Sequence, residues 1–516
     1  MATSTGWQKG LTMQVEVLTS GLTQLKLTTI AWTQDSGGGS QQLNPRPYEI
    51  NVYDTGGNHR RTYITYTYYS YNPDDTVNTV TDARGASATY GYNNRHLLTA
   101  INYVVPSGVA ATSNVAYGYD SVGNRTSMTD GLGSVSYVYN ALSQMTSETR
   151  TFTGVGSYKI AYEYGLVGQL TSLSHYNNAD VLNTQVGYNY DKMGRVTGVT
   201  GSGYAGVSTY ASNLQYRAFG GLKSMTYGNS AQLSLQYDNR LRLTKWDIPN
   251  LVGSGDGYEY NYSILGDNSF RVSRARNIYD PTLNRSYDYD HLGRLEVAHS
   301  GNEADAHVGL GNWGSPPNGP YSYHYGYDQY GNLNYRIGWG GTNPSYSATF
   351  TNNRLPNMVF DASGNMTDAG GGWTFQYDAT GQQTLSAING QYMYYDGDRL
   401  RGKKTVAGAT TYYLRSSVLG GQVVAEIGGG GGWSRGYVYP GSQLLAIQSG
   451  GVYWMHQDPV TKGERVTDGS RTVVSAIELD PWDGSYDLTD PQSFNRYSYT
   501  QNDPVNFTDT GLVLTL

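Results

Sequence analysis

Tyrosines alternate with small or polar residues along many short stretches of the chain, as at 117–119 (YGY), 188–190 (YNY) and 323–327 (YHYGY). An alternation with a period of two places these rings on one face of a β-strand. The stretches run into a recurring motif: an aromatic residue, Asp, two variable residues, Gly and a polar residue. A second stretch, often begun by Leu or Val with Thr, follows the motif. The pattern therefore predicts a β-hairpin at each copy.

The motif holds the residue types that a tight hairpin turn requires. An Asp side chain accepts hydrogen bonds from the backbone amides just ahead of it, which starts the turn. A Gly three residues later supplies the positive φ that closes a type I turn with a bulge. The predicted turn residues are Asp120 and Gly123, Asp191 and Gly194, Asp290 and Gly293, Asp328 and Gly331, and Asp378 and Gly381.

The hairpins are expected to join into one sheet. Looser copies of the motif, as at 53–54, 237–238 and 395–396, extend the repeat over most of the chain. The spacing between copies drifts, which indicates loops of variable length between hairpins. A lone hairpin is only marginally stable in water, so the units must pair edge to edge. We therefore predict an all-β fold of antiparallel hairpin repeats that wind into a spiralling shell.

Composition favours a thin wall over a compact globule. The chain has 50 tyrosines against 8 phenylalanines, 67 glycines, 38% hydrophobic residues and 15% charged residues. A tyrosine buries its ring and still presents a hydroxyl to water or to a neighbour. That suits a wall in which most side chains are half buried. The many glycines indicate many turns.

Charge and residue usage exclude several classes of function. A net charge of −7 offers no basic face for nucleic acid. Without cysteine, disulfides and cysteine-ligated zinc are excluded. The eight histidines are scattered without metal-pair spacing, so we expect no metal and no cofactor. No apolar run has the length of a membrane helix, and the first residues show no secretory signal.

The repeated motif resembles that of the YD-repeat (RHS) proteins, which include bacterial RHS proteins, cocoon-forming components of Tc toxins and the barrel of teneurins. The resemblance extends from about Tyr53 to Leu512. It implies a sheet that winds into a hollow shell able to enclose a C-terminal toxin segment. It further implies a bacterial, secreted or cell-surface protein whose partner is an enclosed polypeptide or another shell segment.

Three regions are expected along the chain. Residues 1–45 read as N-terminal strands, which we interpret as the edge of a truncated shell. Residues 46–415 hold the YD-repeat hairpins. Residues 416–516 resemble the conserved core of the family, and the string NRYSYTQNDPVN at 495–506 is its most specific part.

The end of the chain raises the question of self-cleavage. Family members that process themselves end their core in Asp-Pro-x-Gly-Leu, and aspartates cut after that leucine. The corresponding residues here are Asp509, Thr510, Gly511 and Leu512, so the proline is missing. The candidate catalytic acids are Asp480 and Asp490, although both lie beside prolines, as turn-forming aspartates do. We expect no cleavage after Leu512, and at most a single-turnover aspartyl autoprotease.

Two functions stay open at this point. The first is a structural shell or scaffold of a toxin-enclosing assembly, with no toxin domain on this chain. The alternative is a surface protein that binds carbohydrate or cell-wall polysaccharide through exposed aromatic rings. The face that carries the tyrosines discriminates between them, because an interlocked inward ladder fits a shell and solvent-facing rows fit sugar binding.

Overall fold

The computed structural model describes residues 11–18, 24–34, 45–54, 59–64, 66–202, 204–262, 271–306, 318–329, 331–338, 345–350, 354–387 and 390–477. These residues form forty β-strands. The two helical elements among them are the short η2 (Pro281–Leu283) and α1 (Asn302–Ala306). The predicted all-β class with antiparallel hairpins is therefore confirmed, and no helix in the described part of the chain is long and apolar enough to cross a bilayer.

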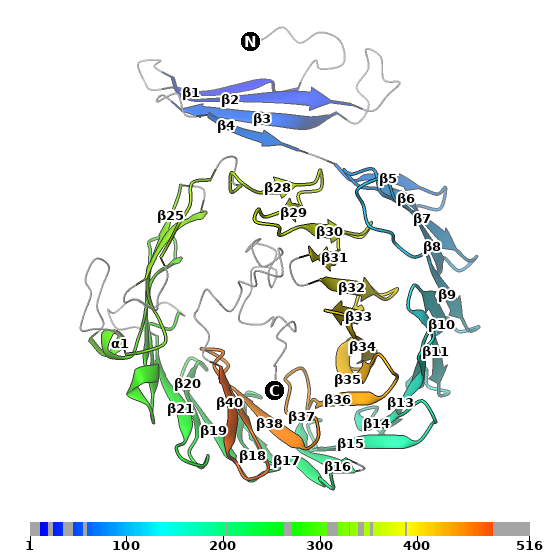
Figure 1. Ribbon diagram of the computed structural model, residues 1–516, viewed down its shortest axis with the longest axis vertical. Helices are drawn as coiled ribbons and strands as arrows, with labels where there is room; N and C mark the ends of the chain where they lie inside the picture. Colours follow the sequence, from blue (N-terminus) through cyan, green and yellow to red (C-terminus); the bar gives the residue numbers. More distant parts are fainter. Residues whose placement is uncertain are drawn as a thin grey trace.

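The first four strands form a sheet of their own. They are β1 (Gln14–Leu18), β2 (Gln24–Thr33), β3 (Arg46–Asp54) and β4 (His59–Tyr63), and each pairs with the next. This sheet lies beside the ring formed by the rest of the chain (Figure 1). The strand pairing thus breaks between β4 and β5. The expected three-part division of the chain stays a prediction.

The next twenty-three strands close into a barrel whose consecutive strands pair antiparallel, and this barrel forms the outer ring in Figure 1. Consecutive strands pair, and β27 meets β5 to close the ring. The strands are β5 (Tyr68–Tyr71), β6 (Val77–Thr81), β7 (Ser87–Tyr92), β8 (Leu98–Val104), β9 (Val115–Tyr119), β10 (Arg125–Asp130), β11 (Gly133–Tyr139), β12 (Met145–Phe152), β13 (Gly156–Tyr164), β14 (Leu170–Tyr176), β15 (Leu182–Tyr190), β16 (Val196–Ser202), β17 (Thr209–Tyr216), β18 (Leu222–Tyr227), β19 (Gln232–Tyr237), β20 (Leu243–Ile248), β21 (Asp256–Asn261), β22 (Arg274–Asn277), β23 (Arg285–Tyr289), β24 (Leu295–Ser300), β25 (Ser322–Tyr327), β26 (Leu333–Gly338) and β27 (Tyr346–Ser347).

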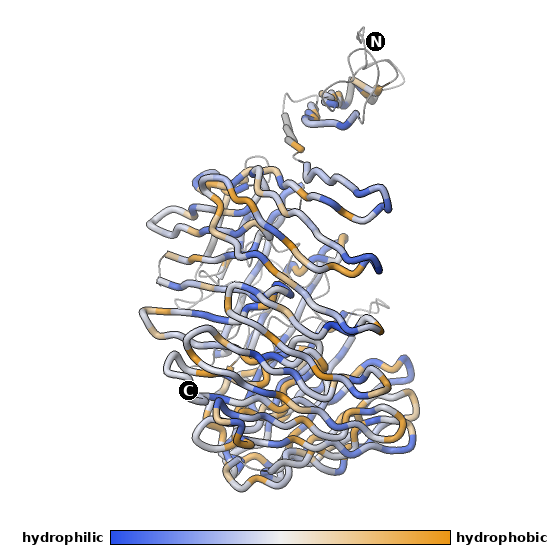
Figure 2. The backbone as a smooth tube through the Cα atoms, turned by 90° about the vertical axis from the view of Figure 1, so that its right-hand side faces the viewer, coloured by the Kyte–Doolittle hydropathy of each residue, from blue (hydrophilic) through white to orange (hydrophobic). Residues whose placement is uncertain are grey.

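The chain then continues inside the ring as an inner layer (Figure 1). A two-stranded sheet, β28 (Val359–Phe360) and β29 (Met366–Asp368), comes first. An eleven-stranded antiparallel sheet follows. Its strands are β30 (Phe375–Tyr377), β31 (Gln383–Ser386), β32 (Gln391–Tyr395), β33 (Arg401–Val406), β34 (Ala409–Ser416), β35 (Gln422–Gly428), β36 (Trp433–Val438), β37 (Ala446–Gln448), β38 (Val452–Gln457), β39 (Glu464–Thr467) and β40 (Val473–Ile477). In the side view the hairpins stack as successive rungs (Figure 2).

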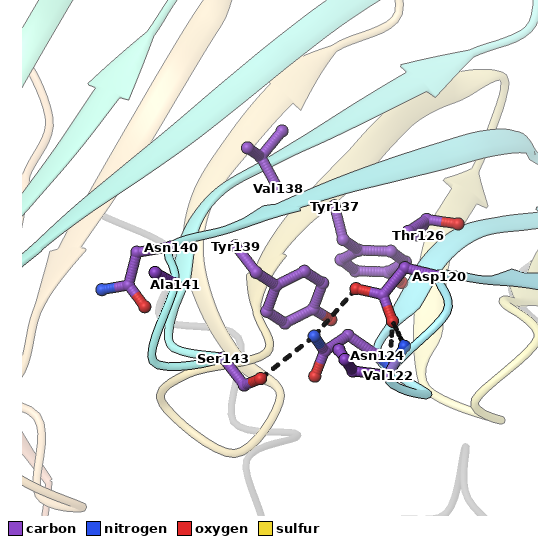
Figure 3. Close-up of a pocket in the computed structure, with 10 residues that line it drawn as sticks. All are labelled: Asp120, Val122, Asn124, Thr126, Tyr137, Val138, Tyr139, Asn140, Ala141 and Ser143. Carbon is purple, nitrogen blue, oxygen red and sulfur yellow. Dashed lines mark hydrogen bonds between the residues drawn. The ribbon is translucent and has the colours of Figure 1, made fainter.

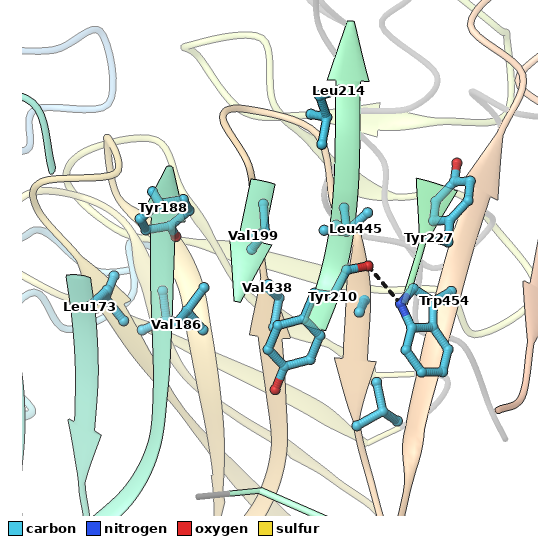
Figure 4. Packing of buried hydrophobic residues seen from close by; sticks show 14 of the residues in the cluster. Leu173, Val186, Tyr188, Val199, Tyr210, Leu214, Tyr227, Val438, Leu445 and Trp454 are labelled. Atoms are coloured by element: carbon cyan, nitrogen blue, oxygen red, sulfur yellow. Dashed lines mark hydrogen bonds between the residues drawn. The ribbon is translucent and has the colours of Figure 1, made fainter. Parts of the chain in front are cut away.

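The two layers meet along a buried contact surface, which we call the seam. Its apolar residues include Leu173, Val186, Val199, Tyr210 and Leu214 of the barrel, and Val438, Leu445 and Trp454 of the inner layer (Figure 4). The Trp454 indole N–H donates to the Tyr210 carbonyl oxygen at 2.9 Å. Because every strand turns alternate side chains inward, the barrel's inner face and the inner sheet's outer face supply one shared core.

Polar groups also cross the seam. The Gln448 amide donates to the Thr184 hydroxyl at 3.1 Å, and the Asn229 amide donates to the Thr467 hydroxyl at 2.8 Å. The Tyr158 hydroxyl donates to the Gly431 carbonyl oxygen at 2.7 Å. Each of these bonds pairs a group that would otherwise be buried without a partner, which costs about 1–3 kcal/mol. The seam therefore fixes which inner strand faces which barrel strand.

Candidate functional site

The turn of each hairpin is built around the aspartate of the motif. In the β15–β16 turn, Asp191 Oδ1 accepts hydrogen bonds from the backbone N–H groups of Met193 at 2.8 Å and Arg195 at 3.0 Å. Gly194 has φ +77° and donates its N–H to the Asp191 carbonyl oxygen at 3.0 Å. The backbone and side-chain bonds from Arg195 hold the pKa of Asp191 below its usual value. The aspartate is thus kept ionised as the hub of the turn.

The other sequence-predicted pairs lie in turns of the same form. In each of them the glycine has positive φ and donates its N–H to the carbonyl oxygen of the aspartate three residues earlier. These pairs are Asp120 with Gly123, Asp290 with Gly293, Asp328 with Gly331, and Asp378 with Gly381. Each also shifts the strand register next to the motif tyrosine, as between Asn189 and Tyr190. The extra residue increases the local twist of the strand pair.

The hydroxyl of the motif tyrosine links each hairpin to the one before it. The Tyr190 hydroxyl donates to the Leu170 carbonyl oxygen at 2.6 Å, and the Tyr216 hydroxyl donates to the Val196 carbonyl oxygen at 2.7 Å. The same bond recurs from Tyr119, Tyr139, Tyr164, Tyr237, Tyr262, Tyr289, Tyr327 and Tyr395. The sequence predicted that these hydroxyls face water or a neighbour, but did not identify the backbone carbonyl of the preceding hairpin as the acceptor. It explains why the repeat uses tyrosine where phenylalanine would fill the same space.

An arginine four residues after the turn aspartate links a hairpin to the one that follows. Arg195 pairs with Asp191 at 2.6 Å, and its guanidinium lies 4.8 Å from the centre of the Tyr216 ring. Arg242 repeats the arrangement with Asp238 and Tyr262, as does Arg294 with Asp290 and Tyr327. The motif arginine therefore binds the aspartate of its own turn and contacts the tyrosine ring of the next hairpin at the same time. Its recurrence four residues after the motif aspartate was the sequence signal that could have revealed this role.

We expect Gly194→Val to destabilise the β15–β16 hairpin by about 1–3 kcal/mol. The space around Gly194 is open, so the cost comes from forcing a β-branched residue to φ +77°. Hydrogen exchange across β14 to β17 measures the local loss. Gly469→Val is the matched control, because that turn glycine is equally open and has no positive φ. Equal exchange in the two variants would show that backbone conformation is not what Gly194 supplies.

A charged cleft of about 290 Å³ lies in the seam between β10–β12 and β33–β35. Buried Arg150 and Asp130 form an ion pair at 2.7 Å, and Asp130 also accepts the backbone N–H of Gly397 at 3.0 Å from the inner layer. Arg125 of the barrel holds Asp398 of the inner layer through two bonds of 2.6 and 2.7 Å. These paired charges clamp the inner layer to the barrel.

Two carboxyl groups of this cleft have raised pKa values. Burial raises the pKa of Glu148, which accepts bonds from the backbone N–H of Ser417 at 2.8 Å and its hydroxyl at 2.6 Å. Burial and the nearby Asp398 and Asp130 raise the pKa of Asp396 to about 6. A protonated carboxyl beside an ionised one is the arrangement of an acid–base pair. Here, however, Glu148, Asp130 and Asp398 each make at least one bond that joins the two layers.

His456 of β38 and Asp458, which directly follows that strand, also belong to the seam. His456 Nε2 lies 2.7 Å from the Thr467 hydroxyl, and its ring meets the Tyr227 ring edge-on. Asp458 is buried and accepts bonds from the Tyr260 hydroxyl of the barrel and from the Val460 backbone N–H. Both side chains therefore have structural partners across or within the layers.

The expected catalytic acids Asp480 and Asp490, and the cleavage-like motif at Asp509, Gly511 and Leu512, lie outside the described residues, whose last is Ile477. Their roles stay predictions. Among the described residues there is no group of three or more His, Asp or Glu side chains placed to hold a metal ion.

Comparison with known proteins identifies the repeat and the fold. A family model described as RHS Repeat matches residues 119–155, which run from the last residue of β9 through β10 and the β11–β12 hairpin. The crystal structure of TcdB2-TccC3-TEV matches 91% of this chain with a TM-score of 0.62 at 15% identity. The Photorhabdus luminescens Tc holotoxin pore, with a mutated TccC3, matches 91% with a TM-score of 0.61 at 14% identity. No curated protein sequence matches significantly. This chain spans 28% and 27% of those two solved chains.

Proposed function

Because this chain is an RHS/YD-repeat protein, we propose that it builds part of the wall of a shell that encloses a polypeptide within a secreted, toxin-type assembly. The observation that carries the proposal is the closed ring with an inner layer sealed against it along the seam. A wall of this kind separates an interior from solvent without any catalytic group. In the described part of the chain, the strand edges without a neighbouring strand belong to the separate four-stranded sheet, the two-stranded sheet and the eleven-stranded inner sheet.

The proposed partners are further shell segments and an enclosed chain. The fold is shared with TcdB2-TccC3, and this chain spans only 28% of that solved chain. A shell of that size needs other segments of the same fold. Among the described residues, β1 and β40 each pair on one side only, so their other edges could accept such segments.

The position of the tyrosines favours the shell over the carbohydrate-binding alternative. Tyrosines of the seam are nearly inaccessible to solvent, as are Tyr158, Tyr210 and Tyr258. Exposed tyrosines also occur, on β5, where Tyr69 and Tyr71 stack at 6.5 Å and are more than half exposed. A sugar-binding surface needs such a row over several strands. Buried tyrosines of the seam, such as Tyr210, are therefore more typical of the repeat than the exposed tyrosines of β5.

Protection of a fused polypeptide tests the shell. We expect an unstructured reporter peptide fused after Leu516 to resist proteinase K at least tenfold longer than the same peptide fused before Met1. The wall would shield the first fusion and leave the second in solvent. Reaction times are read by mass spectrometry of the released peptide. Equal digestion of both fusions would contradict enclosure by this chain.

The same C-terminal fusion tests self-cleavage. We expect the intact mass, because the chain lacks the proline of the family's cleavage motif and so does not fix the φ angle that would aim the scissile strand. A scissile bond that lies about 1 Å from its reactive position can be cleaved a hundredfold more slowly. A free reporter in the unmodified chain that disappears in Asp480→Asn would instead make this protein an aspartyl autoprotease.

A further inference from the structure

The turn between β18 and β19 of the barrel places one side-chain amide against the inner layer. Asn229 lies in this turn, and its Nδ2 donates to the Thr467 hydroxyl at 2.8 Å and to the Asp468 carbonyl oxygen at 2.9 Å. Its Oδ1 accepts the backbone N–H of Ala231 at 3.2 Å. The amide is therefore held at both its nitrogen and its oxygen, in contact with a hydroxyl of the other layer.

The same hydroxyl is bonded to an imidazole. His456 Nε2 lies 2.7 Å from Thr467 Oγ1, and among the described residues no hydrogen-bond partner reaches Nδ1 of His456. Because Thr467 Oγ1 already accepts an N–H of Asn229, this network directs the hydroxyl's own hydrogen to Nε2 and assigns the imidazole proton to Nδ1. Burial lowers the pKa of His456 to about 3, so the ring is neutral at pH 7. A hydroxyl bonded to a neutral imidazole is the arrangement of an activated nucleophile.

Water is excluded from these three side chains. Thr467 and His456 are 0% exposed, and Asn229 is 7% exposed. The Tyr227 ring meets the His456 ring edge-on, with 4.2 Å between the ring centres. In such a dry site, water neither competes for the amide carbon nor hydrolyses a product. The fixed contact between hydroxyl and amide replaces a bimolecular encounter with a reaction inside one chain.

We propose that Thr467 and Asn229 join through an ester bond, which crosslinks the inner layer to the barrel. A bond forms between Thr467 Oγ1 and Asn229 Cγ, and the Cγ–Nδ2 bond breaks. The hydroxyl proton passes to His456 Nε2 and from there to the departing nitrogen, which leaves as ammonia. The Ala231 N–H stabilises the negative charge that develops on Asn229 Oδ1 in the tetrahedral intermediate. The crosslink holds the two layers together irrespective of what the wall encloses.

Two other amide–hydroxyl pairs lack part of this arrangement. Gln448 donates to Thr184 at 3.1 Å within the seam, but the Thr184 hydroxyl bonds to the Ser202 carbonyl oxygen at 3.4 Å and to no imidazole in the described part of the chain. Asn124 donates to Ser143 at 3.2 Å in an open groove of about 430 Å³, whose lining residues include no histidine (Figure 3). Both pairs should keep their amides, because neither has a base and the second is open to solvent.

Peptide mass spectrometry of the purified full chain tests the crosslink. Trypsin places Asn229 in residues 224–240 and Thr467 in residues 466–471. After prolonged incubation of the folded protein, we expect these two peptides as one species, lighter than their sum by one ammonia. Hydroxylamine, which cleaves esters and spares amides, should separate them. The peptides that carry the two contrasting pairs should stay unlinked.

Variants separate the chemistry from the packing. His456→Phe keeps a ring of similar size and removes the base, so the linked species should form about a hundredfold more slowly or less. Thr467→Val should abolish the link, and Thr467→Ser, which retains a hydroxyl, should restore it. Thr184→Val is the matched control, since it removes another threonine hydroxyl of the seam and should crosslink like the wild type. Hydrogen exchange in β18 and β39 verifies that the seam has formed in each variant.

Separate peptides of unchanged mass after the incubation would refute the proposal. Loss of ammonia from residues 224–240 alone would show that the backbone nitrogen of Ser230 attacks Asn229 to form a succinimide, and would also refute it. Conversion of Asn229 to aspartate would show that water is the nucleophile, with the same consequence. A link that forms at the wild-type rate in His456→Phe would overturn the role given to the histidine.

Discussion

Replacing Trp454 with Ala is expected to lower the free energy of unfolding by about 3–5 kcal/mol. The indole is 3% exposed and lies in the middle of the seam, where it belongs to the same buried cluster as Tyr210 and Tyr227. A Cβ placed on Gly228 of the barrel would lie 2.9 Å from the indole ring, so the fit between the layers is tight. Alanine would leave a cavity between two sheets that cannot collapse independently.

Urea unfolding with hydrogen exchange separates packing from hydrogen bonding at this site. Trp454→Phe keeps most of the ring volume and loses the bond to the Tyr210 carbonyl oxygen, so its expected cost is about 1–2 kcal/mol. Tyr71→Ala is the control for aromatic removal, because this ring is 59% exposed and its loss should change stability by no more than about 0.5 kcal/mol. In Trp454→Ala, exchange should rise in both β17 and β38. A rise confined to β38 would mean that the barrel does not depend on the inner layer.

The hairpin could be predicted from the sequence because its determinants are local. Asp191 and Gly194 lie within four residues, and the strand before them shows its period of two directly. The pairing of neighbouring hairpins follows from the need to satisfy strand edges. These local rules were enough for the all-β class and for the winding of antiparallel hairpins.

The seam could not be predicted, because it depends on pairs that are far apart in the chain. Trp454 and Tyr210 are separated by 244 positions in the sequence. Nothing in the motif indicates which strand of the inner layer packs against which strand of the barrel. A tyrosine has the same place in the pattern whether it faces solvent, as Tyr69 does, or the other layer, as Tyr258 does. The bond from Tyr190 to the Leu170 carbonyl oxygen was hidden for a related reason. It depends on the twist between hairpins, which the irregular spacing of the repeat does not reveal.

Acidification from pH 6.5 to 4.5 is expected to lower the stability of the wild type relative to His175→Phe by about 2–3 kcal/mol. His175 is buried on β14, where its cross-strand neighbours are Ile160 and Thr184 and its ring packs against Trp433 of the inner layer. Burial lowers its pKa from 6.5 to about 3. The pKa of His175 is lower in the folded state than in the unfolded state. Its contribution to the free energy of unfolding is therefore fully present above pH 6.5 and is lost as the pH falls toward 3.

The expected dependence of the free energy of unfolding on pH makes the His175 test quantitative. One proton taken up on unfolding changes the free energy of unfolding by about 1.4 kcal/mol per pH unit between the two pKa values. Phenylalanine fills a similar space and does not titrate, so the difference between the two unfolding curves isolates His175. His456, whose pKa burial likewise lowers to about 3, remains in both proteins and cancels.

Asp396→Asn supplies a control of opposite sign. Burial raises the pKa of Asp396 to about 6, above its ordinary value of 3.8. The contribution of Asp396 to the free energy of unfolding is therefore fully present below pH 3.8 and is lost as the pH rises through 6. Acidification should accordingly raise the stability of the wild type relative to Asp396→Asn. Equilibrium urea unfolding at half-unit steps from pH 4.5 to 7 measures both differences. If the wild type and His175→Phe change in parallel over this range, His175 is not held neutral in the seam, and the dry contact between the layers at β14 would have to be abandoned.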